Sequence, residues 1–177
     1  MSTTEVRQEL PTGTWNADPV HSDIAFAVDY MAGTFRGTFS KVEASLVDGE
    51  LRGAAEVASI QVKDPNLEAH LQSPEFFDAE RHPRLTFSSQ AIERSGDQVT
   101  IRGELTLKGH SEPVELRGTI TDPAPDPFGN ERFGLELETV VDRTVFGLRW
   151  NNPLPNGEPA LSDEVKLSAD LQLVKGA

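Results

Sequence analysis

The sequence contains no cysteine, which excludes disulfide bonds, thiolate metal ligands and cysteine nucleophiles. Basic residues are also scarce, since 16 lysines and arginines stand against 29 aspartates and glutamates and leave a net charge of −13. A chain this acidic repels DNA phosphates and anionic lipid headgroups. We therefore expect no nucleic acid among its partners and a fold held together by packing alone.

Long apolar segments are absent as well. No window approaches the roughly 20 consecutive apolar residues that span a bilayer, so we expect a protein that is not membrane-embedded. The first ten residues contain Glu5, Arg7 and Glu9 and no apolar run, unlike a secretory signal. The sequence thus predicts a cytoplasmic protein with a disordered leader over residues 1–12 and one domain over residues 13–177.

What is present is a period of two in the apolar residues, which predicts strands with one buried face. The clearest alternation covers residues 24–30, 99–107, 133–141 and 165–173. Shorter strands are expected, between turn signals, at residues 41–47, 51–62, 84–92 and 114–121. Glycines inside these patterns suit the bends of a curled sheet, so an antiparallel barrel is favoured over a flat sandwich.

One segment breaks the alternation. Asp64 and Pro65 supply a capping residue and a first-turn proline, and Leu67 and Leu71 lie four positions apart. A short helix is therefore expected near residues 65–78, with its end covering one end of the barrel. The fold class predicted from these patterns is all-β with one short helix.

Residues 122–129 form a second irregular stretch. They contain three prolines, which lack amide donors and cannot pair in a central strand. We expect this stretch to be a loop at the rim of the barrel.

No pattern of catalytic residues stands out. His21 and Ser22 are adjacent and would point to opposite faces of a strand, and no Gly-x-Ser-x-Gly turn is present. The four histidines are far apart in sequence, although His21 and His70 could still meet in space. No glycine-rich phosphate loop opens a helix. We expect no catalytic residue, no resident metal and no cofactor.

Seven motifs give the sequence a resemblance to the YceI-like family over about residues 14–175. They are WNADPVHS at 15–22, GTFRGTF at 33–39, HLQSPEFFD at 70–78, HP at 82–83, GELTLKG at 103–109, RTVFGLRWN at 143–151 and SDEV at 162–165. The resemblance implies an extended eight-stranded antiparallel barrel, similar to lipocalins, whose cavity holds a polyisoprenoid or a similar apolar small molecule. It implies carriage or sequestration without catalysis, through burial of apolar surface at roughly 25 cal/mol per Å², and it allows a homodimer.

Tyr30 stands where many relatives have a histidine. Because a phenol carries no positive charge, a quinone or an alcohol would be held here more readily than a diphosphate head. The ligand-binding residues that we expect are His21, Phe26, Tyr30, Phe35, Phe39, Phe77, Phe87, Leu105, Arg143, Phe146 and Trp150.

Two other functions remain open from the sequence. An enzyme at the barrel mouth would need His21, His70 and Arg143 to converge on a polar pocket. A stress-related interaction module would instead have a barrel filled by side chains. Arg143 follows a predicted strand and is expected to point inward, with Asp18 or Asp78 as its partner, unless it forms a surface ion pair. If it points inward, it either contacts the ligand's polar head or ties the helix segment to the barrel.

Overall fold

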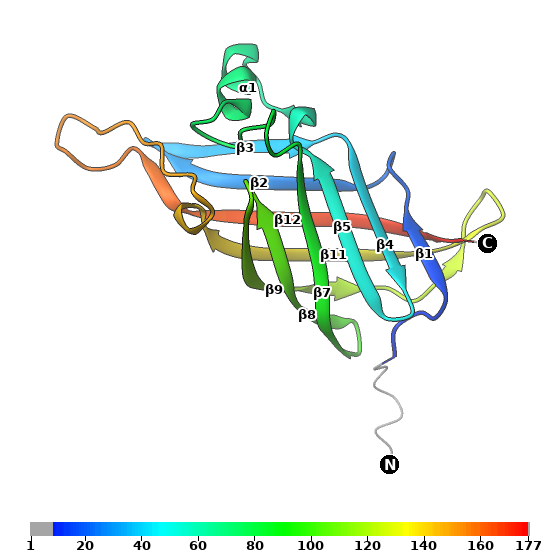
Figure 1. The fold of residues 1–177 in the computed structure, drawn as a ribbon. Coiled ribbons are helices and arrows are strands. Elements are labelled where there is room, and N and C mark those ends of the chain that lie inside the picture. Colours follow the sequence, from blue (N-terminus) through cyan, green and yellow to red (C-terminus); the bar gives the residue numbers. More distant parts are fainter. Residues whose placement is uncertain (1–8, 177) are drawn as a thin grey trace.

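The computed structural model describes residues 9–176, and its main feature is one antiparallel sheet that curls into a barrel (Figure 1). The strands, the helix and two single 3-10 turns (η2 and η3) follow the chain as β1 (Thr14–Ala17), β2 (Asp23–Tyr30), β3 (Gly33–Phe39), β4 (Val42–Val47), β5 (Glu50–Glu56), η2 (Val57–Ser59), β6 (Ile60–Gln61), α1 (Pro65–Gln72), β7 (Arg84–Ser95), β8 (Gln98–Leu107), β9 (His110–Ile120), β10 (Ala124–Pro125), β11 (Glu131–Asp142), η3 (Arg143–Phe146) and β12 (Leu161–Lys175). The predicted leader, residues 1–12, falls mostly outside the described residues. Within its described part, Leu10 packs against the barrel core.

Eight strands close the barrel, which confirms the predicted fold class. Their order around the ring is β11, β9, β8, β7, β5, β4, β1 and β12, and β12 pairs again with β11 to complete it. One edge of the long strand β12 pairs with β11, and its opposite edge pairs with two different strands. It pairs with β2 from Leu161 to Asp170 and with β1 from Leu173 to Lys175. β2, β3 and β6 thus extend the sheet beyond the closed ring.

Two clusters of buried apolar side chains fill the interior because alternate residues of each strand point inward. We call the first the closed core; it packs Trp15 edge-on against Phe133 with ring centroids 5.0 Å apart. Its buried members are Trp15, Leu46, Leu51, Val99, Ile101, Ile120, Phe133, Leu135, Leu137, Leu171 and Leu173. We call the second the cavity core. Its buried members are Phe26, Val28, Phe39, Val42, Ala55, Val57, Ile60, Leu71, Phe76, Phe77, Leu105, Leu107, Phe146, Leu148 and Leu161.

Helix α1 lies on the flank where β3 and β7 are not paired with each other, above β3 in Figure 1. The helix begins at Pro65, as predicted. Its first turn is capped by the side chain of Asp64, which accepts a hydrogen bond from the main-chain N–H of Asn66. The helix ends at Gln72, and residues 74–77 form a turn that buries Phe76 and Phe77. Helix and turn together cover the flank with apolar side chains.

Two further segments position the site. β11 ends at Asp142, whose side chain accepts a hydrogen bond from the main chain of Thr144 and so begins η3. In the predicted rim loop only Ala124 and Pro125 pair, at the edge of β11. Among residues 9–176, no helix has the length and apolar character needed to cross a bilayer.

Candidate ligand-binding site

A cavity of about 200 Å³ lies at the end of the barrel that holds the cavity core. Its walls are the inward faces of β2, β3 and β12, the apolar side of α1 with the following turn, and the segment after η3. The lining residues are Phe26, Val28, Tyr30, Phe35, Leu67, His70, Leu71, Phe76, Phe77, Leu107, Arg143, Leu148, Trp150, Leu161, Val165 and Leu167. Apart from Tyr30, His70 and Arg143, these side chains are apolar, so the cavity suits an apolar ligand.

Partly exposed polar side chains mark the opening of this cavity. His70 on α1 pairs its Nε2 with a carboxylate oxygen of Glu75 at 2.6 Å, and its ring meets Trp150 edge-on with centroids 5.1 Å apart. The hydroxyl of Tyr30 and the indole N–H of Trp150 have no hydrogen-bond partner among residues 9–176. Both groups can therefore donate to a neutral oxygen of a ligand that reaches the opening.

Arg143 lines the cavity but directs its guanidinium into the protein. Its Nη1 donates to the carbonyl oxygens of Leu148 at 2.7 Å and Trp150 at 2.9 Å. Its Nε donates to the carbonyl of Ser162 at 2.8 Å, and its Nη2 to that of Leu161 at 3.4 Å. The guanidinium thus ties η3 and the following segment to the start of β12.

The prediction that Asp18 or Asp78 pairs with Arg143 is wrong. Asp163 approaches Nη2 at 3.8 Å, while Asp18 and Asp78 are not among its contacts. Burial lowers the pKa of Arg143, and the negative charges of Asp163 and Asp142 oppose that shift. Main-chain carbonyls satisfy a buried guanidinium here because the chain after η3 folds back over it, which no sequence pattern reveals.

The inner end of the cavity is aromatic. Phe26 on β2 and Phe77 in the turn after α1 line it, and Phe39 on β3 packs behind both, with centroids 6.2 Å from Phe26 and 5.8 Å from Phe77. Phe39 is only 1% exposed and is not among the lining residues. The three rings are thus in contact, and two of them line the cavity.

The structure places six of the expected ligand-binding residues in the lining: Phe26, Tyr30, Phe35, Phe77, Arg143 and Trp150. The other five lie elsewhere. Phe39, Leu105 and Phe146 are buried in the cavity core behind the lining, and Phe87 packs between the two cores. His21 is exposed on the outside of the barrel. Whether any of these residues contacts a ligand stays a prediction.

Other lining residues were not among the ligand-binding residues expected from the sequence. Val28, Val165 and Leu167 share the inward face of their strands with Phe26, so the period of two contained the signal for them. His70 and Phe76 lie within one of the seven motifs. Leu148 comes from an irregular segment, for which no periodicity exists to predict its orientation.

His21 takes part in a charge network outside the cavity. Oδ2 of Asp18 lies 2.7 Å from Nδ1 of His21 and 2.8 Å from Nη1 of Arg132. These hydrogen bonds, with one from the main chain of Val20, hold the pKa of Asp18 well below its usual range. His21 is therefore not brought together with His70 and Arg143. Within residues 9–176, no group of three or more histidine, aspartate or glutamate side chains is placed to hold a metal ion.

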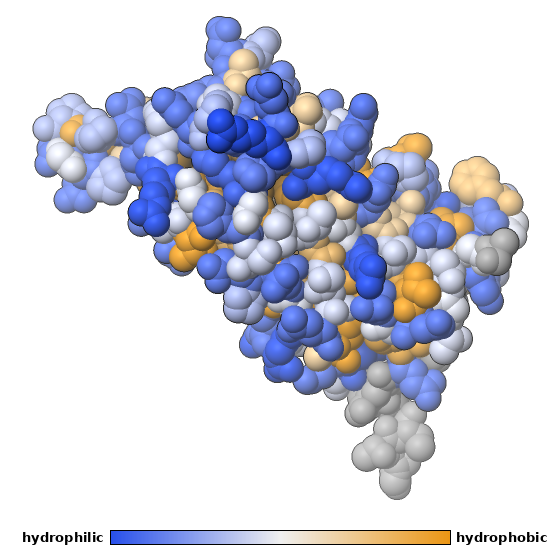
Figure 2. Space-filling view, in the orientation of Figure 1, coloured by the Kyte–Doolittle hydropathy of each residue, from blue (hydrophilic) through white to orange (hydrophobic). Residues whose placement is uncertain are grey.

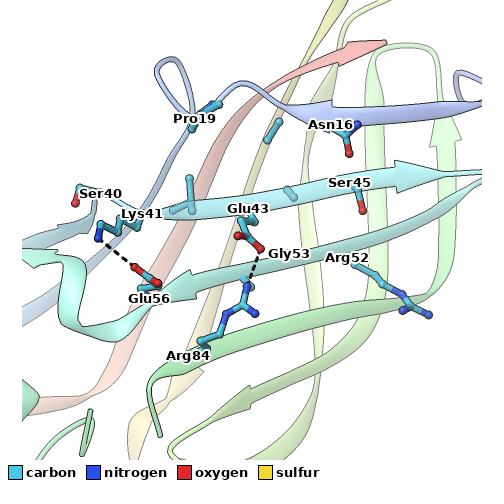
Figure 3. Close-up of a pocket in the computed structure, with 14 residues that line it drawn as sticks. Asn16, Pro19, Ser40, Lys41, Glu43, Ser45, Arg52, Gly53, Glu56 and Arg84 are labelled. Atoms are coloured by element: carbon cyan, nitrogen blue, oxygen red, sulfur yellow. Dashed lines mark hydrogen bonds and ion pairs between the residues drawn. The ribbon is translucent and has the colours of Figure 1, made fainter. Parts of the chain in front are cut away.

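A larger hollow of about 750 Å³ runs over the outer face of β1, β4, β5 and β7. Figure 3 shows that charged side chains cross it in pairs: Glu43 binds Arg84 at 2.7 Å, and Lys41 lies 3.7 Å from Glu56. Hydrophilic residues also cover most of the face seen in Figure 2. The charges of this hollow already neutralise one another in contact with water, so the smaller apolar cavity is the better candidate for a ligand-binding site.

Comparison with known sequences gives a consistent family match. The YceI-like domain matches residues 15–173. Protein YceI of Escherichia coli O157:H7 is 27% identical over 137 residues, which cover 73% of this chain and 72% of that protein. Protein YceI of Salmonella newport is 29% identical over 136 residues, which cover 72% of this chain and 71% of that protein.

Solved structures share the barrel. BcnA of Burkholderia cenocepacia superposes with a TM-score of 0.71 at 20% identity, over 88% of this chain and 98% of that chain. A polyisoprenoid binding domain from Saccharophagus degradans, implicated in plant cell wall breakdown, superposes with a TM-score of 0.73 at 10% identity, over 94% of this chain and 100% of that chain. At these identities the likeness supports the fold.

Proposed function

The chain belongs to the YceI-like domain family, and we propose that it binds an isoprenoid-type lipid in the cavity of its barrel and carries or sequesters it without chemical change. The observation that carries the proposal is the void itself, which is walled by apolar side chains at one end of an otherwise packed barrel. A ligand that fills such a void gains binding free energy from buried apolar surface, at about 25 cal/mol per Å². The solved polyisoprenoid binding domain with the same fold supports this choice of ligand class.

The opening favours a neutral head group. Tyr30 and Trp150 offer hydrogen-bond donors, and the guanidinium of Arg143 is already engaged by four carbonyl oxygens. The guanidinium of Arg143 is thus not free to pair with a diphosphate, and His70, the other basic side chain of the lining, is already paired with Glu75. The net charge of −13 also opposes an anionic ligand. A quinone or an alcohol fits these groups best.

Two alternatives have less support. An enzyme at the opening required His21, His70 and Arg143 to converge, and His21 lies outside the barrel in the network with Asp18. An interaction module with a filled barrel would have no void of this size at its core. The pair of His70 and Glu75 is the remaining polar feature, and we interpret it as a support for the edge-on contact of His70 with Trp150.

The experiment is native mass spectrometry of protein purified from its own cells, followed by organic extraction of the bound material. We expect a lipid of isoprenoid type on the wild-type protein. Val165→Trp should prevent its retention because Val165 lines the cavity. Val140→Trp is the matched control, since Val140 is 58% exposed on the outside of β11. A folded wild-type protein that carries no lipid and takes up none from added prenols or quinones would overturn the proposal.

A further inference from the structure

The cavity ends abruptly at one level of the barrel. The paired residues Phe26 and Leu167 both line it, whereas the next inward pair, Ile24 and Ala169, does not. Beyond that level Ala169 packs against the closed core, whose Leu173 is completely buried. Only part of the barrel's length is therefore hollow.

Three phenylalanine rings form the boundary. The centroids of Phe26, Phe39 and Phe77 lie 5.8 to 6.4 Å from one another, so the rings are in mutual contact. Phe26 and Phe77 present one side to the cavity, and Phe39 fills the space behind them. We call this group the phenylalanine floor.

We propose that the phenylalanine floor sets the length of the apolar tail that the protein accepts, so that its ligand is a short-chain prenyl lipid with a neutral oxygen head. This inference rests on the proposed function and adds the length of the ligand to it. Phe39 is then a specificity-determining residue, although it does not touch the ligand.

The strand geometry gives the length. Along β2 the lining runs from Tyr30 at the opening to Phe26 at the floor, a separation of four positions and about 14 Å at about 3.4 Å per residue. A strand advances about 3.4 Å over three main-chain bonds, so the four bonds of an isoprene unit span about 4.5 Å. The cavity therefore accepts about three isoprene units. Its volume of about 200 Å³, below the range of about 300–1,000 Å³ for drug-sized ligands, agrees with a short tail.

The test is a series of prenols with two, three, four and six isoprene units, added from cyclodextrin complexes and titrated by the change in tryptophan fluorescence, to which Trp150 in the cavity contributes. For the wild-type protein we expect affinity to rise at least about tenfold from two units to three, because each methylene that enters the cavity adds to binding. From three units to four we expect no further rise, since the fourth unit meets the floor.

Phe39→Leu should leave space behind Phe26 and Phe77 and so lengthen the cavity. The affinity for the four-unit prenol relative to the three-unit prenol should then improve by at least about fivefold. Phe133→Leu is the matched control, because Phe133 is equally buried but lies in the closed core, where the same change opens no space beside the cavity. Thermal melting establishes that both variants fold. If Phe39→Leu does not fold, the wild-type length series still tests whether the cavity limits the length of the tail.

Affinity that keeps rising through four and six units in the wild-type protein would overturn the floor and leave the proposed function standing. The floor is equally overturned if Phe39→Leu folds and ranks the prenols as Phe133→Leu does. Absence of binding at every length would overturn the proposed function, and the floor with it.

Discussion

Phe26 and Gly37 face each other across β2 and β3, and the ring of Phe26 occupies the space that a side chain at position 37 would need. A Cβ atom at Gly37 would stand 2.6 Å from two ring atoms of Phe26 and 3.0 Å from a methyl group of Val62. The glycine therefore lets the ring lie flat over β3, where it forms part of the cavity wall.

Gly37→Ala should displace the ring of Phe26 and reduce the affinity for a short prenol, with a loss of about 1–3 kcal/mol in the free energy of unfolding from the crowding. Gly33→Ala is the control on the same strand, because a Cβ there meets nothing within 4 Å. Urea unfolding and prenol titration of the two variants measure the effect. Equal results for both would show that the Phe26–Gly37 contact has no role in the site.

A second prediction concerns the closure of the barrel. At Gly118 on β9 a Cβ would overlap the carbonyl oxygen of Glu136 on β11, so the two main chains can approach this closely only because position 118 has no side chain. Gly118→Ala should lower the free energy of unfolding by about 3 kcal/mol or more, since main-chain atoms must move. Gly134→Ala, whose Cβ would have only ordinary contacts, should change it by less than about 1 kcal/mol. Similar stability of the two variants would contradict the close approach.

A third prediction follows from the contacts of Arg143. Arg143→Ala should lower the free energy of unfolding by about 3–5 kcal/mol, because it leaves buried carbonyl oxygens of the segment after η3 without donors. Arg143→Lys should recover little of this, since an ammonium group cannot reproduce the planar fork of donors. The neighbouring Arg149→Ala is the control, because Arg149 is exposed.

The combined measurement is thermal melting with prenol titration. A variant Arg143→Ala that melts like the wild-type protein but no longer binds prenols would show instead that the guanidinium contacts the ligand.

A fourth prediction is a pH dependence at Asp18. Because its pKa is lowered in the folded protein, its ion pairs stabilise the fold fully above the unfolded pKa of about 3.9, and this contribution is lost as the pH falls towards the folded pKa. The wild-type protein should therefore exceed Asp18→Asn in stability at pH 6, and the difference should shrink below about pH 4.

Urea unfolding of both proteins between pH 3 and pH 7 measures this difference. Asp48→Asn is the control, since the side chain of Asp48 has no ion pair among residues 9–176 and its left-handed backbone (φ 50°) suits asparagine. A difference that is constant with pH would contradict the lowered pKa of Asp18.

The period of two predicted most of the strands because a barrel wall has one apolar face, and Asp64 with Pro65 predicted the start of α1. The strand β3 was recognised only as a motif with glycines, since Gly33 and Gly37 interrupt its apolar face. The segment over residues 51–62 was expected as one strand, but the 3-10 turn η2 divides it into β5 and β6. Local patterns do not reveal such a break, because it depends on where the barrel bends.

For the site, the sequence predicted residues of the right type more readily than their orientation. Phe26 and Phe39 belong to inward faces of adjacent strands, yet one lines the cavity and the other lies behind it. That difference depends on the position of Phe77, which comes from the turn after α1 and contacts Phe39. The partners of Arg143 depend in the same way on how an irregular segment folds back.

The most direct test of ligand binding in the cavity uses the two tryptophans of the chain. Trp150 lines the cavity, whereas Trp15 on β1 is buried in the closed core, at the end of the barrel away from the segment that joins η3 to β12 (Figure 1). The measurement is a fluorescence titration of Trp15→Phe with a benzoquinone that carries a two-isoprene tail, since a quinone ring quenches an indole that it contacts. We predict saturable quenching of Trp150 in this variant and little quenching of Trp15 in Trp150→Phe. Quenching that does not saturate, or that is equal in the two variants, would contradict a ligand in this cavity.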